Sequence, residues 1–182
     1  MILTSARYLT GPSWPLLAIL ASVAMLAGAH AFEVFGKMAP CPLCLRQRDV
    51  YWAAIAMAAT GLILWQRQPE GRKLIALNVM LGLVFLTGAV VAGYHAGVEW
   101  QWWRGPDGCS GGGVGDISNI DLSAALGQPI ATVSCTEAPW RMFGISMAGY
   151  NAAISAGLAL LSFAASAFVR TVARHNVQAA AE

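Results

Sequence analysis

The sequence predicts an all-α membrane protein: a four-helix transmembrane bundle with two loops on the outer side of the membrane. Composition is the first observation behind this fold class, because 57% of the 182 residues are hydrophobic and 11% are charged, whereas about a quarter of a soluble domain is charged. The second observation is four long apolar runs separated by polar segments. Each run is long enough for the roughly 20 helical residues that cross a bilayer core of about 30 Å. A net charge of +2 without a Lys/Arg-rich block gives no basis for a nucleic-acid partner.

The four spans are expected to belong to one integral membrane domain over residues 1–182. The expected spans lie at about residues 14–32, 42–65, 74–94 and 142–169, and the outer loops at 33–41 and 95–141. The first span has no charged residue between Trp14 and Phe32. Because Ala29-His30-Ala31 also resembles a signal-peptidase site, a cleaved signal peptide is the alternative for this segment.

Two polar residues lie at membrane depth, Asn78 in the third span and Asn151 in the fourth. A polar side chain without a partner is costly in the membrane. We therefore expect each amide to hydrogen-bond across the bundle.

The distribution of basic residues predicts the orientation. If the N-terminus lies inside, the inner segments hold Arg7, Arg67, Arg72, Lys73, Arg170 and Arg174, and the outer segments hold Lys37, Arg46, Arg48, Arg104 and Arg141. The difference in number is small, but the inner residues are concentrated in shorter segments. Since Lys and Arg are enriched on the cytoplasmic side, both termini are expected in the cytoplasm and both larger loops outside.

The motif Cys41-Pro42-Leu43-Cys44 lies where the second span is expected to begin. Pro42 suits the first position of a helix, because its φ is already helical and its missing N–H would have no partner there. The positive end of the helix dipole favours a thiolate at this place, and Arg48 returns to the helix face of Cys44. Four-residue cysteine rings gain little from loop closure and are known chiefly as exchange sites. We therefore expect Cys41 and Cys44 to be redox-active.

The loop expected at residues 95–141 contains the other two cysteines, Cys109 and Cys135. Its clustered tryptophans, close to the third span, are typical of an interfacial belt. Residues Asp116 to Gly127 are expected to form a short surface helix, and Gly127 followed by Pro129 is typical of a helix end. Cys109 lies between a Gly-Pro-Asp-Gly turn and a glycine-rich strip, so its backbone is expected to move more freely than that of Cys135.

All four cysteines are expected on the exported side of the membrane, where an oxidising compartment permits disulfides. The obvious pairing joins Cys41 to Cys44 and Cys109 to Cys135. For the second pair a purely structural disulfide is the alternative, since loop closure would stabilise the fold by roughly 3 to 4 kcal/mol in the chain-entropy model. A zinc site is a weaker alternative, because it usually has two close ligand pairs while Cys109 and Cys135 stand alone. No metal ion is therefore expected.

Taken together, these features closely resemble bacterial DsbB, the family of disulfide bond formation proteins. The residues that carry the resemblance are the motif Cys41-Pro42-Leu43-Cys44, Arg48, Tyr94-His95, Gly97-Val98-Glu99, Gly105-Pro106, Cys109, Cys135, Glu137, Trp140 and Arg141. With the four spans they cover nearly the whole chain. The glycine strip after Cys109 is a local peculiarity.

The resemblance implies an enzyme of the bacterial inner membrane, a disulfide-generating thiol:quinone oxidoreductase with its active cysteines in the periplasm. A reduced periplasmic DsbA-like protein of the thioredoxin fold would attack Cys109. Cys135 and Cys109 would pass the electrons to Cys41 and Cys44, and Cys44 would pass them to a quinone cofactor, ubiquinone or menaquinone. A strong oxidant such as DsbA needs an electron sink of this kind behind it. The protein is expected to be a monomer surrounded by membrane lipid.

Two further residues receive roles through the resemblance. Arg48 would favour the Cys44 thiolate and polarise a quinone carbonyl as negative charge develops. The alternative for Arg48 is an anchor to lipid headgroups. For His95, contact with the quinone and interfacial packing both stay open.

Two other functions remain as alternatives. Proteins that resemble the vitamin K epoxide reductase family also use a four-helix bundle with cysteine pairs and a quinone, but their Cys-x-x-Cys that meets the quinone lies late in the chain. A non-enzymatic scaffold with four spans and structural disulfides would explain the topology. It would not explain Cys41 and Cys44 at the mouth of a helix, or Arg48 after them.

Overall fold

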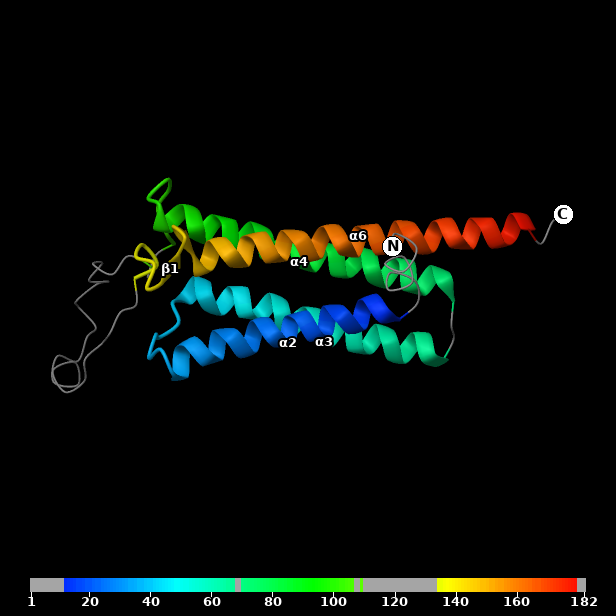
Figure 1. Cartoon of the computed structure of the whole chain (residues 1–182), viewed down its shortest axis with the longest axis horizontal. Helices are drawn as coiled ribbons and strands as arrows, with labels where there is room; N and C mark the ends of the chain where they lie inside the picture. The colour runs from blue at the N-terminus through cyan, green and yellow to red at the C-terminus, as the bar shows by residue number, and fades with distance from the viewer. Residues whose placement is uncertain (1–11, 68–69, 107–108, 110–133, 180–182) are drawn as a thin grey trace, which may run out of the picture.

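In the computed structural model, long helices run up and down beside one another and form a bundle (Figure 1). The structure describes residues 12–67, 70–106, 109 and 134–179. Its elements are α2 (Ser13–Val34), α3 (Pro42–Arg67), α4 (Gly71–Glu99), β1 (Arg141–Met142), β2 (Ile145–Ser146) and α6 (Met147–Ala179). The end of α2, the start of α3, the end of α4 and the start of α6 all meet at the left end of the bundle in Figure 1. The short surface helix expected at 116–127 lies outside the described residues.

Three of the described helices are long and apolar enough to cross a membrane, which makes the chain a multi-pass membrane protein. They are Ser13–Val34, Gly71–Glu99 and Met147–His175. Helix α3 does not meet the same criterion, because polar residues flank its apolar run at both ends, Arg48 and Asp49 before it and Gln66 and Arg67 after it. It nevertheless lies lengthwise in the bundle, packed against α2 on one side and α4 on the other (Figure 1).

Contacts between α4 and α6 are the most extensive in the bundle. Phe85 and Leu81 of α4 are fully buried in a core that also takes Ala58 from α3 and Ala159 from α6. Gly82 permits the close approach of α4 and α6, because a Cβ atom at this position would lie 2.6 Å from the Phe163 ring. Small residues are used in this way where membrane helices pack closely.

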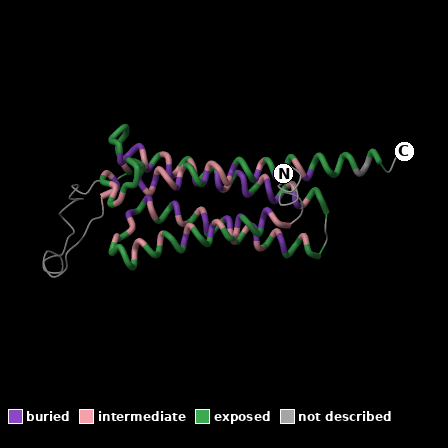
Figure 2. Tube along the Cα trace, in the orientation of Figure 1, coloured by how far each residue is buried: buried purple, intermediate pink, exposed green. Residues whose placement is uncertain are grey.

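The outward faces of the helices are apolar. Leu20, Val90 and Leu160 are 64%, 65% and 70% exposed, and Figure 2 shows exposed positions recurring along the outside of each helix. Since nothing in the described chain covers these side chains, lipid is their natural surrounding. The last turns of α6, which include Arg170 and Arg174, extend past the bundle and are exposed (Figure 2).

Helix α2 covers the first expected span and is part of the bundle. Ala18 and Leu26 are buried in the main core, and the Trp14 indole Nε1–H donates to Ser162 Oγ of α6 at 3.1 Å. The structure therefore shows this segment as a helix packed into the bundle.

Helix α4 extends beyond the expected end of its span. The outer loop was expected to begin at His95, but α4 continues to Glu99 and places His95 on a helix. A Schellman motif ends it: the N–H of Trp102 donates to Gly97 O at 2.9 Å and that of Gln101 to Val98 O at 3.0 Å. Gln101 has φ 61°, a conformation that glycine usually supplies at this position, so the usual sequence signal is missing.

The start of the last helix also differs from expectation. The span was expected from about residue 142, but β1 and β2 pair as an antiparallel hairpin and α6 begins at Met147. Phe143 and Gly144, between the strands, have φ of 51° and 80°. Positive φ at both central residues is typical of the tight type I′ turn. Phe-Gly is not a usual sequence for this turn, so the hairpin was not predicted.

Candidate functional site

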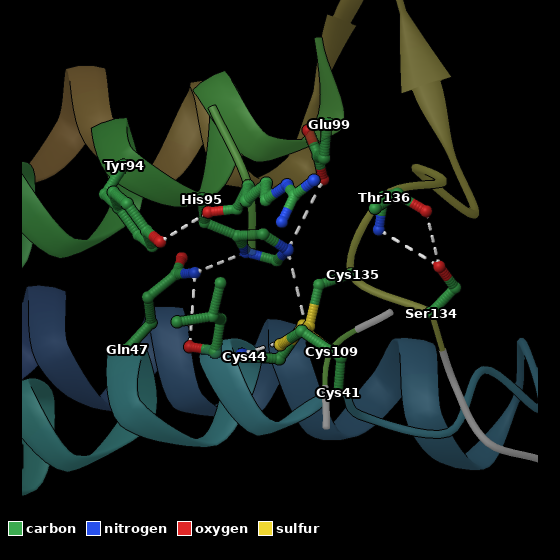
Figure 3. The surroundings of a disulfide bond; sticks show 12 residues. Cys41, Cys44, Gln47, Tyr94, His95, Glu99, Cys109, Ser134, Cys135 and Thr136 are labelled. Atoms are coloured by element: carbon green, nitrogen blue, oxygen red, sulfur yellow. Dashed lines mark hydrogen bonds and ion pairs between the residues drawn. A yellow bond between two sulfur atoms is a disulfide. The ribbon is translucent and has the colours of Figure 1, made fainter. Parts of the chain in front are cut away.

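The cysteines meet at one end of the bundle, although they come from three separate segments of the chain (Figure 3). Cys41 immediately precedes α3 and Cys44 lies in its first turn. Cys109 follows α4, and Cys135 precedes the hairpin. Cys41, Cys109 and Cys135 are buried and form a cluster with Leu43 and Val98.

The two cysteine pairs differ in the geometry of their sulfur atoms. Cys109 and Cys135 form a disulfide, and the Cys135 N–H also donates to Cys109 O at 2.9 Å. Cys41 and Cys44 are free thiols whose sulfur atoms lie 2.7 Å apart. The disulfide between Cys109 and Cys135 is the one that the sequence favoured. Cys41 and Cys44 lie next to each other, as the favoured pairing requires, but they are not bonded in the structure.

Cys41 is the N-cap of α3. Its carbonyl accepts the N–H of Leu45 at 3.1 Å, and its sulfur accepts the N–H of Cys44 at 3.2 Å, as the oxygen of a capping side chain does. Pro42 is therefore the first helical residue, as predicted. Hydrogen bonding with the Cys44 sulfur and burial raise the pKa of the Cys41 thiol, and the backbone N–H groups of Leu43 and Cys44 oppose this only in part. In the reduced pair, Cys41 is accordingly held as the neutral thiol.

The disulfide lies against the free pair. The sulfurs of Cys41 and Cys135 and a ring nitrogen of His95 all lie within 4.8 Å of one another. Thiolates and imidazole are zinc ligands, but Cys135 is engaged with Cys109 in this state and has no free thiolate to offer. The arrangement instead brings one sulfur of each pair into the range from which thiol–disulfide exchange needs only a small movement.

The segment after α4 folds back over the helix and positions Cys109. Trp103 stacks on Tyr94, with ring centroids 5.9 Å apart, and its Nε1–H donates to Tyr94 O at 2.9 Å. A Cβ atom on Gly97 would overlap the Trp103 ring, so this packing requires glycine. Further along, the Cys109 N–H donates to Pro106 O at 2.9 Å.

Arg48 is held by helix α2. Its Nη1 donates to Glu33 Oε2 at 2.6 Å and its Nη2 donates to Ala29 O at 3.3 Å, while its side chain is 15% exposed. The guanidinium therefore bridges α3 and α2. The spacing from Cys44 predicts the place of Arg48, but no local spacing connects Arg48 with Glu33, because the two residues lie on different helices.

His95 is buried between the cysteines and a polar network. Its Nε2 lies 3.6 Å from Cys41 Sγ and 3.8 Å from Glu99 Oε1. On the other side of the ring, Nδ1 lies 2.7 Å from Gln47 Nε2 (Figure 3). Sequence analysis did not single out Gln47, and it quoted Glu99 only as part of the family pattern.

The polar network continues across the bundle through Asn151. Its Nδ2 donates to Gln47 Oε1, and its Oδ1 accepts from the hydroxyl groups of Tyr51 and Ser155. The expectation that Asn151 hydrogen-bonds across helices is confirmed. The same expectation for Asn78 is wrong, since both polar atoms of its amide are buried without a hydrogen-bond partner in the described part of the chain.

A cavity of about 350 Å³ adjoins these residues. Its lining includes polar groups from Cys44, Arg48, His95, Glu99 and Asn151. The remaining wall is largely apolar and includes Phe32, Trp140 and Ile154. Ligand cavities in proteins typically have volumes of about 300 to 1,000 Å³, apolar walls and a few placed polar groups. The cavity thus fits an apolar ring with polar atoms at its edge.

The fold and the site together define a class of protein: a multi-pass helical membrane protein with a free dithiol packed against a disulfide at one end of its bundle. The family model for DsbB, disulfide bond formation protein DsbB, matches residues 12–165. The chain belongs to the DsbB family.

Named relatives are similar over most of their length. A disulfide bond formation protein B of Dechloromonas aromatica (strain RCB) is 29% identical, over 83% of this chain and 88% of that protein. A protein of the same name from Xanthomonas axonopodis pv. citri (strain 306) is 28% identical, over 88% and 93%. An uncharacterized protein of Rickettsia prowazekii (strain Madrid E) is 30% identical, over 75% and 76%. No solved structure matches the chain.

Proposed function

We propose that this protein is a thiol:quinone oxidoreductase that re-oxidises a DsbA-like dithiol protein and delivers the electrons to a membrane quinone. The observation that carries the proposal is the junction of the two cysteine pairs. The sulfurs of Cys135 and Cys41 lie within 4.8 Å of each other, and Cys44, the partner of Cys41, lines the cavity. Membership of the DsbB family and the names of its relatives support the same chemistry.

The electron path is a series of thiol–disulfide exchanges. A thiolate of the reduced partner attacks Cys109, forms a mixed disulfide and releases Cys135 as a thiolate. Cys135 attacks Cys41 in an oxidised Cys41–Cys44 pair, and Cys44 leaves with the electron pair as a thiolate. The partner's second thiol then frees Cys109 and completes the partner's disulfide.

The last exchange restores the disulfide between Cys109 and Cys135. Cys109 attacks Cys135, re-forms the Cys109–Cys135 disulfide and leaves Cys41 and Cys44 both reduced. The structure contains this combination of a disulfide and two free thiols. A bound quinone would accept two electrons and two protons as the Cys41–Cys44 disulfide forms again, so each turnover makes one disulfide in the partner.

The residues around the cavity fit a quinone. Its largely apolar wall suits a lipid-soluble ring, and Arg48 and His95 bring hydrogen-bond donors to its lining. Arg48 would stabilise the Cys44 thiolate and negative charge on a carbonyl oxygen of the ring. His95 would contribute an N–H group between this cavity and Cys41.

The proposal includes a location. We place the cysteine end of the bundle in the periplasm and both termini in the cytoplasm, with α3 as a fourth span of the bacterial inner membrane. Arg67 and Arg72 at the opposite end of the bundle, together with Arg170 and Arg174, support this orientation. Lipid covers the apolar outer faces, and one chain contains both cysteine pairs and the cavity, so a monomer suffices.

The test is quinone-linked turnover by the purified full-length protein in detergent. A reduced DsbA-class protein and a soluble ubiquinone analogue are added, and the quinone absorbance is followed together with the partner's thiol content. We expect one quinone to be consumed for each partner disulfide formed, and Cys44→Ser to abolish consumption. Partner oxidation without quinone consumption, or full consumption by the Cys44→Ser variant, would contradict the proposal.

A further inference from the structure

The polar network beside His95 includes a hydrogen bond from Gln47 to a backbone carbonyl, and a carbonyl can only accept. Gln47 Nε2 lies 3.3 Å from the backbone oxygen of Leu43, one turn earlier in α3. A backbone carbonyl only accepts hydrogen bonds, so the side-chain atom that faces it must be the NH₂ group of Gln47. This contact sets the orientation of an amide whose oxygen and nitrogen could otherwise be exchanged.

The rest of the network agrees with that orientation. With the NH₂ of Gln47 towards Leu43, Oε1 faces Asn151, which donates from Nδ2. The Asn151 oxygen then faces the hydroxyl groups of Tyr51 and Ser155, and both can donate to it. Gln47, Asn151 and Ser155 are 6%, 9% and 0% exposed, so the network lies inside the bundle. Each of these contacts joins a donor to an acceptor, which favours one orientation of the whole network.

This orientation determines which nitrogen of His95 carries the proton. The second N–H of Gln47 Nε2 is directed to His95 Nδ1 at 2.7 Å, so Nδ1 must accept and cannot be protonated. In the neutral ring the proton then lies on Nε2. Cys41 Sγ, at 3.6 Å from Nε2, is within hydrogen-bond range for sulfur, whereas Glu99 Oε1, at 3.8 Å, is beyond the range for oxygen.

We propose that Gln47 and Asn151 are positioning residues that hold His95 as the Nε2–H tautomer, with this N–H directed at the junction of the Cys41 and Cys135 sulfurs. The inference rests on the proposed function, because it assigns the N–H a task in exchange between the two cysteine pairs. It gives Gln47 of α3 and Asn151 of α6, which also line the cavity, a task in the exchange between the cysteine pairs.

The task is to stabilise charge that moves between sulfurs. When Cys135 attacks Cys41, the Cys135–Cys41 bond forms, the Cys41–Cys44 bond breaks and one negative charge passes from Cys135 to Cys44. No proton needs to be transferred in this step. A hydrogen-bond donor at the central sulfur stabilises the charge as it passes, whereas the lone pair of an unprotonated Nε2 would repel it.

Nitrogen NMR measures the tautomer directly. The full-length protein is prepared in detergent with ¹⁵N-labelled histidine, and the signal of His95, one of three histidines, is assigned by its loss in the His95→Gln variant. We expect a protonated Nε2 and an unprotonated Nδ1. The Gln47→Glu variant keeps the shape of the side chain but places an acceptor against Nδ1, so we expect Nδ1 to become protonated.

A matched control separates positioning from a general loss of buried polar groups. Asn78→Leu also removes a buried amide, but Asn78 is not part of the network, so we expect the His95 signals to stay as in the wild type. A protonated Nδ1 in the wild type would overturn the inference, even if no variant folds. A folded Gln47→Glu variant that keeps the wild-type tautomer would overturn it as well.

The rate of exchange tests the consequence. Reduction of Cys109–Cys135 by a soluble dithiol is started in a stopped-flow mixer, and transfer to Cys41–Cys44 is followed by acid quench and mass spectrometry. We expect Gln47→Glu to slow this transfer by about tenfold or more and Asn78→Leu to leave it unchanged. An unchanged rate in Gln47→Glu would overturn the assigned task.

The outcomes also separate this inference from the proposed function. The NMR measurement needs neither quinone nor partner. If the wild type consumes no quinone but shows the Nε2–H tautomer, the proposed function is wrong and the positioning of His95 by Gln47 and Asn151 still holds. Normal quinone turnover with a protonated Nδ1 removes the positioning alone.

Discussion

At the scale of single residues, Arg48 shows what a helix-face argument can and cannot predict. Its spacing from Cys44 placed it on the same side of α3, and both residues line the cavity. Its ion-pair partner Glu33 comes from α2, so the guanidinium also contacts a second helix. Arg48 is thus fixed between the two helices by hydrogen bonds from both Nη1 and Nη2.

Substitution of Arg48 should separate charge from geometry. We expect Arg48→Ala to lower the rate of quinone reduction by roughly 100-fold, the effect of removing one donor that stabilises developing charge. Arg48→Lys keeps the charge but loses the fork and should be intermediate. Initial rates with a soluble quinone analogue, at varied quinone concentration, give kcat and KM for each variant.

Arg46→Ala is the control for this series. The Arg46 side chain is 77% exposed, and its Nη1 lies 3.9 Å from Asp49 Oδ2 in the same helix. Such an exposed ion pair contributes little to stability. Its loss should leave the quinone kinetics near those of the wild type. If Arg48→Ala behaved like Arg46→Ala, Arg48 would be a structural link to α2 rather than part of the cofactor site.

The other residues of the site show why a sequence predicts reactive groups more readily than their support. The four cysteines were predicted to be redox-active from the spacing of Cys41 and Cys44 and from the expected position of all four on the exported side of the membrane. Gln47 follows Cys44 in the chain and Asn151 lies on the last helix, and neither residue type signals a function. Their relation to His95 exists only after α3, α4 and α6 pack together, so tertiary structure alone reveals it.

At the scale of elements, hydropathy predicted the helices, whereas local backbone geometry sets their ends. The Schellman motif after α4 uses Gln101 in place of glycine, and the hairpin before α6 uses Phe143-Gly144. Both depart from the residues that usually mark these structures. The lengthening of α4 has a consequence for function, because it carries His95 and Glu99 on a rigid helix beside the cysteines.

Two glycines of α4 offer a matched test of helix packing. A Cβ atom at Gly82 would lie 2.6 Å from the Phe163 ring, whereas one at Gly93 would meet nothing within 4 Å. We expect Gly82→Ala to lower the free energy of unfolding by about 1 to 3 kcal/mol, the usual cost of overpacking. Gly93→Ala should raise it by up to about 1 kcal/mol, because alanine favours the helix. Thermal unfolding in detergent would measure both, and equal midpoints would contradict this view of the α4–α6 contact.

At the scale of the whole molecule, the chemistry is confined to one end of the bundle. The sequence predicted that all four cysteines lie on the same side of the membrane, because each lies in an outer loop or at the outer end of a span. It could not predict that the Cys135 sulfur reaches Cys41, since this contact depends on how the segments after α4 and before α6 fold onto the helix ends. Cys109 and Cys135 are each 1% exposed, so the proposed attack of a soluble partner on Cys109 would require a local opening of the structure.

The orientation of the bundle follows from its two ends and can be tested without the native cysteines. Cys41, Cys109 and Cys135 are buried, so an added surface thiol is the better probe. Lys37 near the cysteine end and Arg72 at the other end are both exposed basic residues. With the cysteine end in the periplasm, a membrane-impermeant maleimide should label the Lys37→Cys variant in intact cells. Labelling of Arg72→Cys should require a broken inner membrane, because Arg72 lies in the basic connection that the positive-inside rule places in the cytoplasm.

Wild-type cells measure the background from Cys44, the native thiol that is only partly buried. Labelling of both variants after the membrane is broken shows that each added thiol is accessible in the folded protein. The reverse pattern, with Arg72→Cys labelled in intact cells and Lys37→Cys protected, would place Cys41 and Cys44 on the reducing side of the membrane. A relay that exports disulfides could not operate there, because cytosolic thiols are kept reduced. The orientation and the proposed function would then fail together, whereas the tautomer of His95, which depends only on contacts inside the bundle, would be unaffected.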